Sequence, residues 1–175
     1  VVKLLIRKGA KVNTTDANGS SALCEAIDKG YDEVIRLLLD SEASVAGHGA
    51  IHTAAEKGAE EILKLLIVHD ADIEATDDLG MRALHHASNR GHVDAVQFLL
   101  NKGAVINPED EKGCSPLYMA VVSGHEDVVK LFLSKGAAVN SKAADGKIPL
   151  HEAAHRGYTQ IVRLLVEGGS DIAAS

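Results

Sequence analysis

Large aromatic side chains are scarce in this chain of 175 residues, which has three Tyr, two Phe and no Trp. So few rings offer no ladder on which the bases of a single-stranded nucleic acid would stack. Acidic side chains also outnumber basic ones, 25 against 18, which gives a formal net charge of −7. Because nucleic-acid binding depends on neutralising phosphates with cations, we expect no nucleic-acid partner.

Long apolar runs and reactive motifs are missing as well. No run approaches the roughly 18 residues that a membrane-spanning helix needs, so we expect no membrane insertion. The chain contains no G-x-S-x-G motif and no phosphate-binding loop, and its carboxylates are scattered along the sequence. We therefore expect that the protein is not an enzyme and that it needs no cofactor and no metal.

What the chain has in abundance is a pattern of Leu, Ala, Val and Ile that recurs. Each copy has an apolar residue before a short polar residue or His, then an Ala, then a Gly, then a Leu-rich run. Leu84, Leu117 and Leu150 mark this pattern at intervals of 33 residues. Such self-similarity indicates small units that stack one after another instead of folding around one global core. The five copies begin at Ser21, Gly49, Arg82, Ser115 and Ile148.

Within a copy, the apolar residues predict two short helices. Leu84 and Ala87 fall at helical spacing, and so do Val93 and Val96 after the separating Gly91. Helices this short are marginal alone in water, so they must pack against the helices of neighbouring copies. Between helix pairs, polar segments carry a Gly at a fixed place, which favours a tight turn. These glycines are Gly19, Gly80, Gly113 and Gly146.

The segments SPLYMA, IPLHEAA, KGAAVN and NKGAVIN resemble the ankyrin repeat, whose signature combines TPLHxAA, a Gly and VVxLLLxxGAxVN. The resemblance covers nearly the whole chain. It implies an all-α repeat solenoid of helix-turn-helix pairs with β-hairpin fingers, whose concave face binds a protein or peptide partner. We expect one domain over 1–175, made of a partial repeat at 1–15 and units 1 to 5 at 16–46, 47–76, 77–109, 110–142 and 143–175.

Neither end of the chain resembles a capping repeat. The stripe of Val1, Leu4 and Leu5 would expose apolar surface, so we expect further repeats or domains in the parent chain. Cys24 and Cys114 lie three stacking steps apart, roughly 25 to 30 Å, beyond the reach of a disulfide. We expect two free thiols, as is typical of a reducing compartment, and a monomer that is intracellular and cytoplasmic.

A basic stripe is predicted just before the Gly that separates the two helices of each unit. Four of the five residues there are cations, and Ser123 takes the remaining place. The stripe could recruit an acidic partner, or each cation could complement the C-terminal end of its helix dipole. The four cations are Lys29, Lys57, Arg90 and Arg156.

Apolar residues replace polar ones at three places in units 3 and 4. Leu79 and Met81 lie in a finger, and Val122 lies where other units have Asp28, Glu56, Asn89 or His155. Apolar anchors ringed by polar groups commonly carry most of the binding energy of an interface, so these three are candidate hot spots. The alternative is that Leu79 and Met81 only pack between adjacent fingers.

The nine histidines do not predict a metal site. His52, His85 and His151 share one repeat position, and the resemblance implies that the ring there ties its turn together by hydrogen bonds. The adjacent His85 and His86 are the only candidates for a local cluster, and they point to different faces of a helix.

One junction departs from the pattern. Val45 and Ile51 are six residues apart where other units have eleven, which should remove the finger tip of unit 2. At the same junction Glu42 takes a place where Gly normally adopts a left-handed conformation, and Asp70 makes a milder version of that departure. We expect this junction to be the weakest step. The gap is either a notch for a bulky partner segment or a tolerated loop deletion.

The sequence thus predicts a protein-interaction module that binds its partner through Leu79, Met81, Arg90, Val122 and Arg156. Two alternatives stay open: a regulatory repeat domain of a larger enzyme, receptor or channel, and a structural spacer without a specific ligand. The resemblance adds a further site, because Asn13 and Asn107 lie in contexts similar to those of hydroxylated asparagines in ankyrin proteins.

Overall fold

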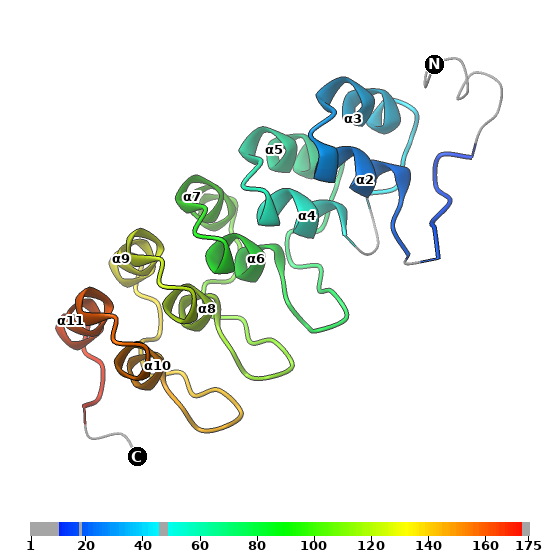
Figure 1. Ribbon diagram of the computed structural model, residues 1–175. Helices are drawn as coiled ribbons and strands as arrows, with labels where there is room; N and C mark the ends of the chain where they lie inside the picture. Colours follow the sequence, from blue (N-terminus) through cyan, green and yellow to red (C-terminus); the bar gives the residue numbers. More distant parts are fainter. Residues whose placement is uncertain (1–10, 18, 46–48, 173–175) are drawn as a thin grey trace.

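The computed structural model describes residues 11–17, 19–45 and 49–172. The predicted apolar stripe of Val1, Leu4 and Leu5 lies outside these residues. The described part folds into helix pairs stacked in one direction (Figure 1). The helices are α2 (Ala22–Lys29), α3 (Asp32–Leu39), α4 (Ala50–Glu56), α5 (Glu60–Val68), α6 (Ala83–Asn89), α7 (Val93–Asn101), α8 (Pro116–Val122), α9 (Glu126–Ser134), α10 (Pro149–His155) and α11 (Thr159–Glu167).

The helices form two rows, which confirms the all-α solenoid predicted from the repeats. The inner row holds α2, α4, α6, α8 and α10, and the outer row holds α3, α5, α7, α9 and α11 (Figure 1). The finger loops leave the inner row on the side away from the outer row. We call the surface formed by the inner helices and the finger loops the inner face.

One continuous core runs through the stack. Leu63, Leu99 and Phe132 of the outer helices are fully buried in it, as the apolar spacing predicts. The inner helices each bury an Ala, such as Ala87 of α6 and Ala120 of α8. Because Ala has only a methyl group, neighbouring inner helices can approach closely, and their contacts hold helices that would be marginal alone.

The fingers are tight loops with very little strand. In the described residues, β-pairing is limited to isolated bridges between Thr15 and Ser21 and between Thr76 and Arg82, so the predicted hairpins are reduced to single bridges. The reason is local, because a side chain closes the tip of the third finger. The Asp77 carboxylate accepts hydrogen bonds from the backbone N–H groups of Leu79 and Met81, each at 2.9 Å.

Single backbone hydrogen bonds join neighbouring fingers. The N–H of Glu111 donates to the carbonyl of Leu79 at 3.0 Å, and the N–H of Ala144 donates to that of Lys112 at 2.8 Å. The fingers of units 3, 4 and 5 therefore form a linked row along one edge of the inner face.

The backbone at the unusual junction is left-handed, as predicted. Glu42 has a φ of 60° and Asp70 a φ of 63°, and they are the only non-Gly residues with positive φ in the described part of the chain. The corresponding places after α7 and α9 hold Gly103 and Gly136, with φ of 93° and 77°. This conformation costs a residue with a Cβ about 1–2 kcal/mol, so both positions are strained.

Replacing Glu42 with Gly should relieve that strain. We expect Glu42→Gly to raise the free energy of unfolding by about 0.5–1 kcal/mol, because the gain in the folded state exceeds the added flexibility of the unfolded chain. Urea denaturation gives the free energy, and amide hydrogen exchange should show slower exchange in α3 and α4. Gly136→Ala is the control and should change stability in the opposite direction. A destabilised Glu42→Gly protein would contradict the assignment.

Candidate functional site

The ends of the inner helices place the predicted basic stripe in one column. Lys57, Arg90, Ser123 and Arg156 are the C-cap residues of α4, α6, α8 and α10, and Lys29 is the last residue of α2. Cations at these ends are favoured by the helix dipole. The dipole interpretation therefore agrees with their placement, and the side-chain contacts add a second effect.

Most of the stripe is paired with acceptors from the preceding unit. The Lys57 ammonium lies 2.9 Å from the Asp28 carboxylate, and the Arg90 guanidinium bonds the Glu56 carboxylate through two of its nitrogens. The Ser123 hydroxyl continues the series, because it donates to the side-chain oxygen of Asn89 in α6 at 2.8 Å. We call these three contacts, each between adjacent units, the cross-unit ladder.

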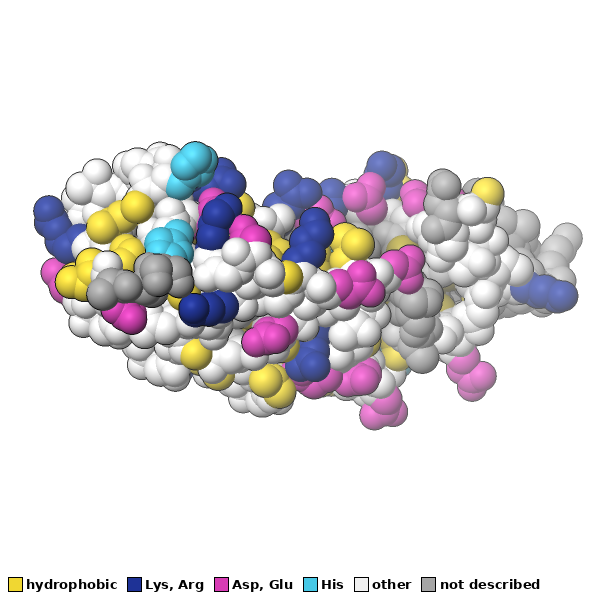
Figure 2. Space-filling view, turned by 90° about the horizontal axis from the view of Figure 1, so that it is seen from below, with side chains coloured by type: hydrophobic (Ala, Val, Ile, Leu, Met, Phe, Trp, Pro, Cys, Tyr) yellow, Lys and Arg dark blue, Asp and Glu magenta, His cyan; other side chains and the backbone are white. Residues whose placement is uncertain are grey.

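The ladder neutralises much of the charge that the sequence suggested. Asp28 also bonds Lys29 at 2.8 Å, and hydrogen bonds from Lys29 and Lys57 lower the pKa of its carboxyl to about 2. The stripe is thus a row of ion pairs and polar pairs instead of a continuous positive surface. Figure 2 shows the same character from below the array, with dark blue and magenta side chains interleaved along its length.

The last step of the series is different. Val122 occupies the place of the ladder acceptors, and it offers no hydrogen-bond acceptor to Arg156. Arg156 instead donates through Nε to Glu152 of its own helix, at 3.3 Å. Glu152 also accepts from Lys147 at 3.1 Å, and the bonds from Lys147 and then Arg156 lower the pKa of this buried carboxyl although burial itself raises it.

The three apolar candidates lie on the inner face in two separate places. Leu79 is 56% exposed at the finger tip, and Met81, further along the same finger, is half-buried. Neither side chain belongs to the main core or to a second apolar cluster in unit 4. Val122, at the end of α8, packs half-buried against that second cluster. Leu79 thus keeps more than half of its surface open instead of filling the space between fingers.

The second apolar cluster contains residues that sequence reasoning missed. Cys114, Tyr118 and Ala143 are buried in it, and Met119 packs against it beside Val122. The signal was available, because Met119 is apolar where the other units have Glu25, Thr53, His86 or Glu152.

Cys24 and Cys114 are both buried and neither forms a disulfide, as predicted. Burial raises the pKa of Cys114 to about 11 and that of the neighbouring Tyr118 to about 12. Both groups are therefore neutral near pH 7, and Cys114 lacks the thiolate that reactivity requires.

The histidines at the shared repeat position tie turns together, as the resemblance implied. The Nδ1 of His85 accepts from the backbone N–H of Arg82 at 3.0 Å, so its Nε2 carries the proton and donates to the carbonyl of Cys114 at 3.1 Å. His86 points elsewhere, to Asp77 at 2.9 Å. Among the residues that the structure describes, no three His, Cys, Asp or Glu side chains gather as metal ligands would.

The burial of His85 predicts a pH dependence of stability. Burial lowers the pKa of His85 below 6.5, so near pH 6 the unfolded chain binds more protons than the folded one. Its contribution is present above about pH 6.5 and is lost as the pH falls, by at most about 1.4 kcal/mol between pH 7.5 and 5.5. Urea unfolding of the wild type and of His85→Gln should show a stability gap that narrows at pH 5.5. A gap that does not depend on pH would contradict this.

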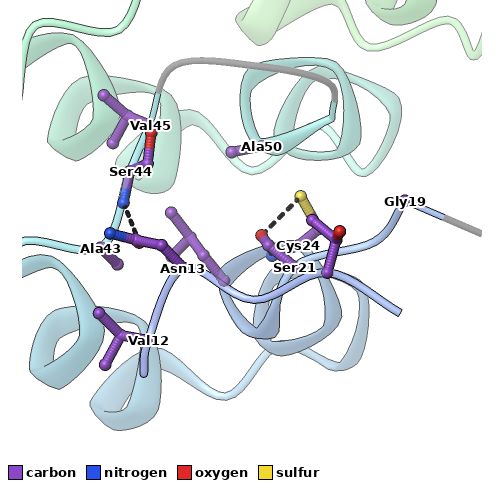
Figure 3. Close-up of a pocket in the computed structure, with 11 residues that line it drawn as sticks. Val12, Asn13, Gly19, Ser21, Cys24, Ala43, Ser44, Val45 and Ala50 are labelled. Atoms are coloured by element: carbon purple, nitrogen blue, oxygen red, sulfur yellow. Dashed lines mark hydrogen bonds between the residues drawn. The ribbon is translucent and has the colours of Figure 1, made fainter. Parts of the chain in front are cut away.

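The shortened junction leaves hollows beside the first described finger. A cavity of about 320 Å³ lies between this finger and the finger of unit 3, and Cys24 lines it together with Gly19, Ser20, Gly49, His52, Thr53, Asp77 and Asp78. A second cavity, of about 410 Å³, also borders Cys24. Asn13 and Ser44 lie toward one end of this second cavity, and Ser21 and Cys24 lie toward the other (Figure 3). Residues 46–48, where the shortened finger of unit 2 is expected, lie outside the described residues, so the loss of its tip stays a prediction.

The predicted hydroxylation sites hold adjacent units together. The side-chain oxygen of Asn13 accepts from the N–H of Ser44 at 2.7 Å, and that of Asn107 accepts from the N–H of Ala138 at 2.9 Å. Asn140 repeats the contact with Asp171 at 2.9 Å. Each side chain has a structural role at the exit of its unit, and hydroxylation of Asn13 and Asn107 stays a prediction.

None of the helices in the described ranges has the length and apolar run that crossing a bilayer requires.

Comparison with known proteins identifies the repeat. The family model described as ankyrin repeats, in three copies, matches residues 51–143 and residues 109–175. The two matches together span 51–175, which is more than half of the chain. A search of curated proteins found no similar sequence. Ankyrin repeats are generally protein-interaction modules. The stacked helix pairs, the linked fingers and this match agree, and the chain belongs to the ankyrin repeat family.

Proposed function

We propose that this chain binds a partner protein or peptide on its concave inner face. The observation that carries the proposal is the open apolar surface there: Leu79 is 56% exposed, and Met81 and Val122 are each partly exposed. Apolar side chains ringed by polar groups are typical of the energetic centre of an interface. We assign Leu79, Met81 and Val122 as the apolar contacts.

The polar residues of the inner face form the rim in this proposal. Arg90 and Lys57 are already held by Glu56 and Asp28. They therefore lose less side-chain entropy on binding a partner than mobile cations would. Lys29 and Arg156 complete the stripe. Paired rim charges change the rate of association and its salt dependence more than the final affinity.

Affinity capture with two matched variants tests the proposal. Leu79→Ser with Val122→Ser removes apolar surface from the inner face. Val68→Ser with Val105→Ser removes exposed apolar surface elsewhere, because Val68 ends an outer helix and is 77% exposed, and Val105 follows α7 and is 50% exposed. Before the capture, the wild type and both variants must show the same helical content and melting behaviour.

The expected result is a set of source-cell proteins captured by the wild type and by the outer variant but lost with the inner variant. If all three proteins capture the same set, or if both variants lose it equally, the assignment of the inner-face apolar contacts is wrong. In that case the regulatory repeat domain or the structural spacer becomes the better interpretation.

A further inference from the structure

The cross-unit ladder does not continue at the step between units 4 and 5. In the first three steps a residue of one unit accepts from a residue of the next: Asp28 from Lys57, Glu56 from Arg90 and Asn89 from Ser123. Glu56 and Arg90 are 34 residues apart, as are Asn89 and Ser123, and Val122 and Arg156 continue the series at the same offset. The fourth step therefore sets an arginine opposite an alkyl side chain.

This substitution leaves hydrogen-bonding capacity on Arg156. Its Nε donates to Glu152 at 3.3 Å, and within the described residues its two terminal nitrogens have no hydrogen-bond partner. Arg90 differs, because both its Nε and one terminal nitrogen are held by Glu56. The side chain of Arg156 is 40% exposed, so its open donors reach solvent on the inner face.

The surroundings of Arg156 combine paired charges with an apolar floor. Val122 and Met119 lie partly exposed on α8 and pack against the cluster of Cys114 and Tyr118. Lys147 has a half-exposed side chain and is also paired with the carboxylate of Asp145, at 3.1 Å. The one carboxylate that both cations share is that of Glu152, whose side chain is only 10% exposed and lies beneath them.

We propose that the step between units 4 and 5 anchors a partner carboxylate that is followed or preceded by an apolar side chain. The inference rests on the proposed function and names the partner chemistry: an Asp or Glu for the open guanidinium donors of Arg156, and an apolar neighbour for Val122 and Met119. Guanidinium groups bind carboxylates through two parallel hydrogen bonds, which gives both strength and orientation. The Glu152 carboxylate below opposes a dianion, so a singly charged carboxylate fits better than a phosphate.

Selection from a displayed library of random, unphosphorylated peptides tests this anchor on the full chain. Val122→Asp should fill the site from within, because it supplies an acceptor at the offset that Glu56 has from Arg90. Arg156→Gln removes the guanidinium with its charge and its paired donors and leaves the buried residues intact, so it carries the test even if Val122→Asp does not fold. Arg163→Gln is the matched control, since it makes the same charge change on the outer helix of the same unit.

The wild type and Arg163→Gln should both enrich peptides with Asp or Glu next to Leu, Ile, Met or Phe. Those peptides should bind Arg156→Gln and Val122→Asp about 10- to 100-fold more weakly, as expected for the loss of hydrogen bonds between charged groups. Unchanged binding to Arg156→Gln, or equal weakening by Arg163→Gln, overturns the anchor. Enriched peptides without an acidic residue overturn the anchor alone and leave peptide binding intact, whereas a selection that enriches no peptide counts against both.

Discussion

Replacing Phe132 with Ala should lower the free energy of unfolding by about 3–5 kcal/mol. The ring is the largest fully buried side chain in the described residues and belongs to the continuous core in α9. Its removal loses the hydrophobic transfer energy and leaves a cavity that helices fixed on both sides cannot close. Because each unit is stabilised by its neighbours, we expect the loss to appear in the whole cooperative transition, measured by urea denaturation.

Phe98 provides the matched control for this prediction. It lies on α7 one residue before the place that corresponds to Phe132, and it is only partly buried. The ammonium groups of Lys64 and Lys102 lie 5.9 and 5.7 Å from the centre of its ring, on the side of the helix that solvent reaches. Phe98→Ala should therefore cost less than half as much as Phe132→Ala. Equal losses would show that burial in the stack does not decide the cost.

The second large effect is expected at Gly58, which separates α4 from α5. Its φ is 66°, and a Cβ added there would lie 2.6 Å from the ring of His92 in the next unit. That ring is held by a 2.8 Å contact between its Nε2 and the carbonyl of Glu56. Gly58→Ala therefore combines the left-handed strain of about 1–2 kcal/mol with a displaced hydrogen bond worth about 1 kcal/mol. We expect a total loss of about 2–3 kcal/mol in urea denaturation.

Gly30 separates these two contributions. It has the same place in unit 1 and nearly the same φ, 68°, but no atom lies within 4 Å of an added Cβ. The residue of unit 2 that corresponds to His92 is Ala59, which carries no ring. Gly30→Ala should show only the backbone strain. If the two substitutions cost the same, the contact between Gly58 and His92 contributes nothing to stability.

The repeat spacing in the sequence predicted the fold because each unit repeats the same pattern of apolar residues and glycines. The alternation of apolar stripes and separating glycines was sufficient for the helix pairs. The left-handed backbone at Glu42 and Asp70 also followed, because Gly occupies the equivalent places of other units. The hairpin fingers that the resemblance implied are present as tight turns closed by a backbone hydrogen bond, such as that from the Asp77 N–H to the Met81 carbonyl at 2.9 Å. How little strand they contain could not be predicted, because a single side chain such as Asp77 accepts other backbone N–H groups of the tip.

The candidate site was harder to predict, because its contacts join residues that only stacking brings together. The sequence singled out Arg90 and Arg156 as equal members of one basic stripe. The structure shows that Glu56 holds the first and that Glu152 of its own helix holds the second. Which partner a long side chain chooses depends on the distance between neighbouring helices and on the residue at the facing position. The ladder partners Glu56 and Arg90 are 34 residues apart, which is one unit plus one residue. Applying the same offset to the sequence would have placed Val122 opposite Arg156.

The cross-unit ladder also implies that the order of the units is encoded in their side chains. Each join has its own chemistry: carboxylate with ammonium between units 1 and 2, carboxylate with guanidinium between units 2 and 3, and amide with hydroxyl between units 3 and 4. If unit 4 followed unit 2 directly, Glu56 would face Ser123 and lose its cation. The units share the same pair of helices, but the carboxylates of units 1 and 2 each need a unit that brings a cation to the next position.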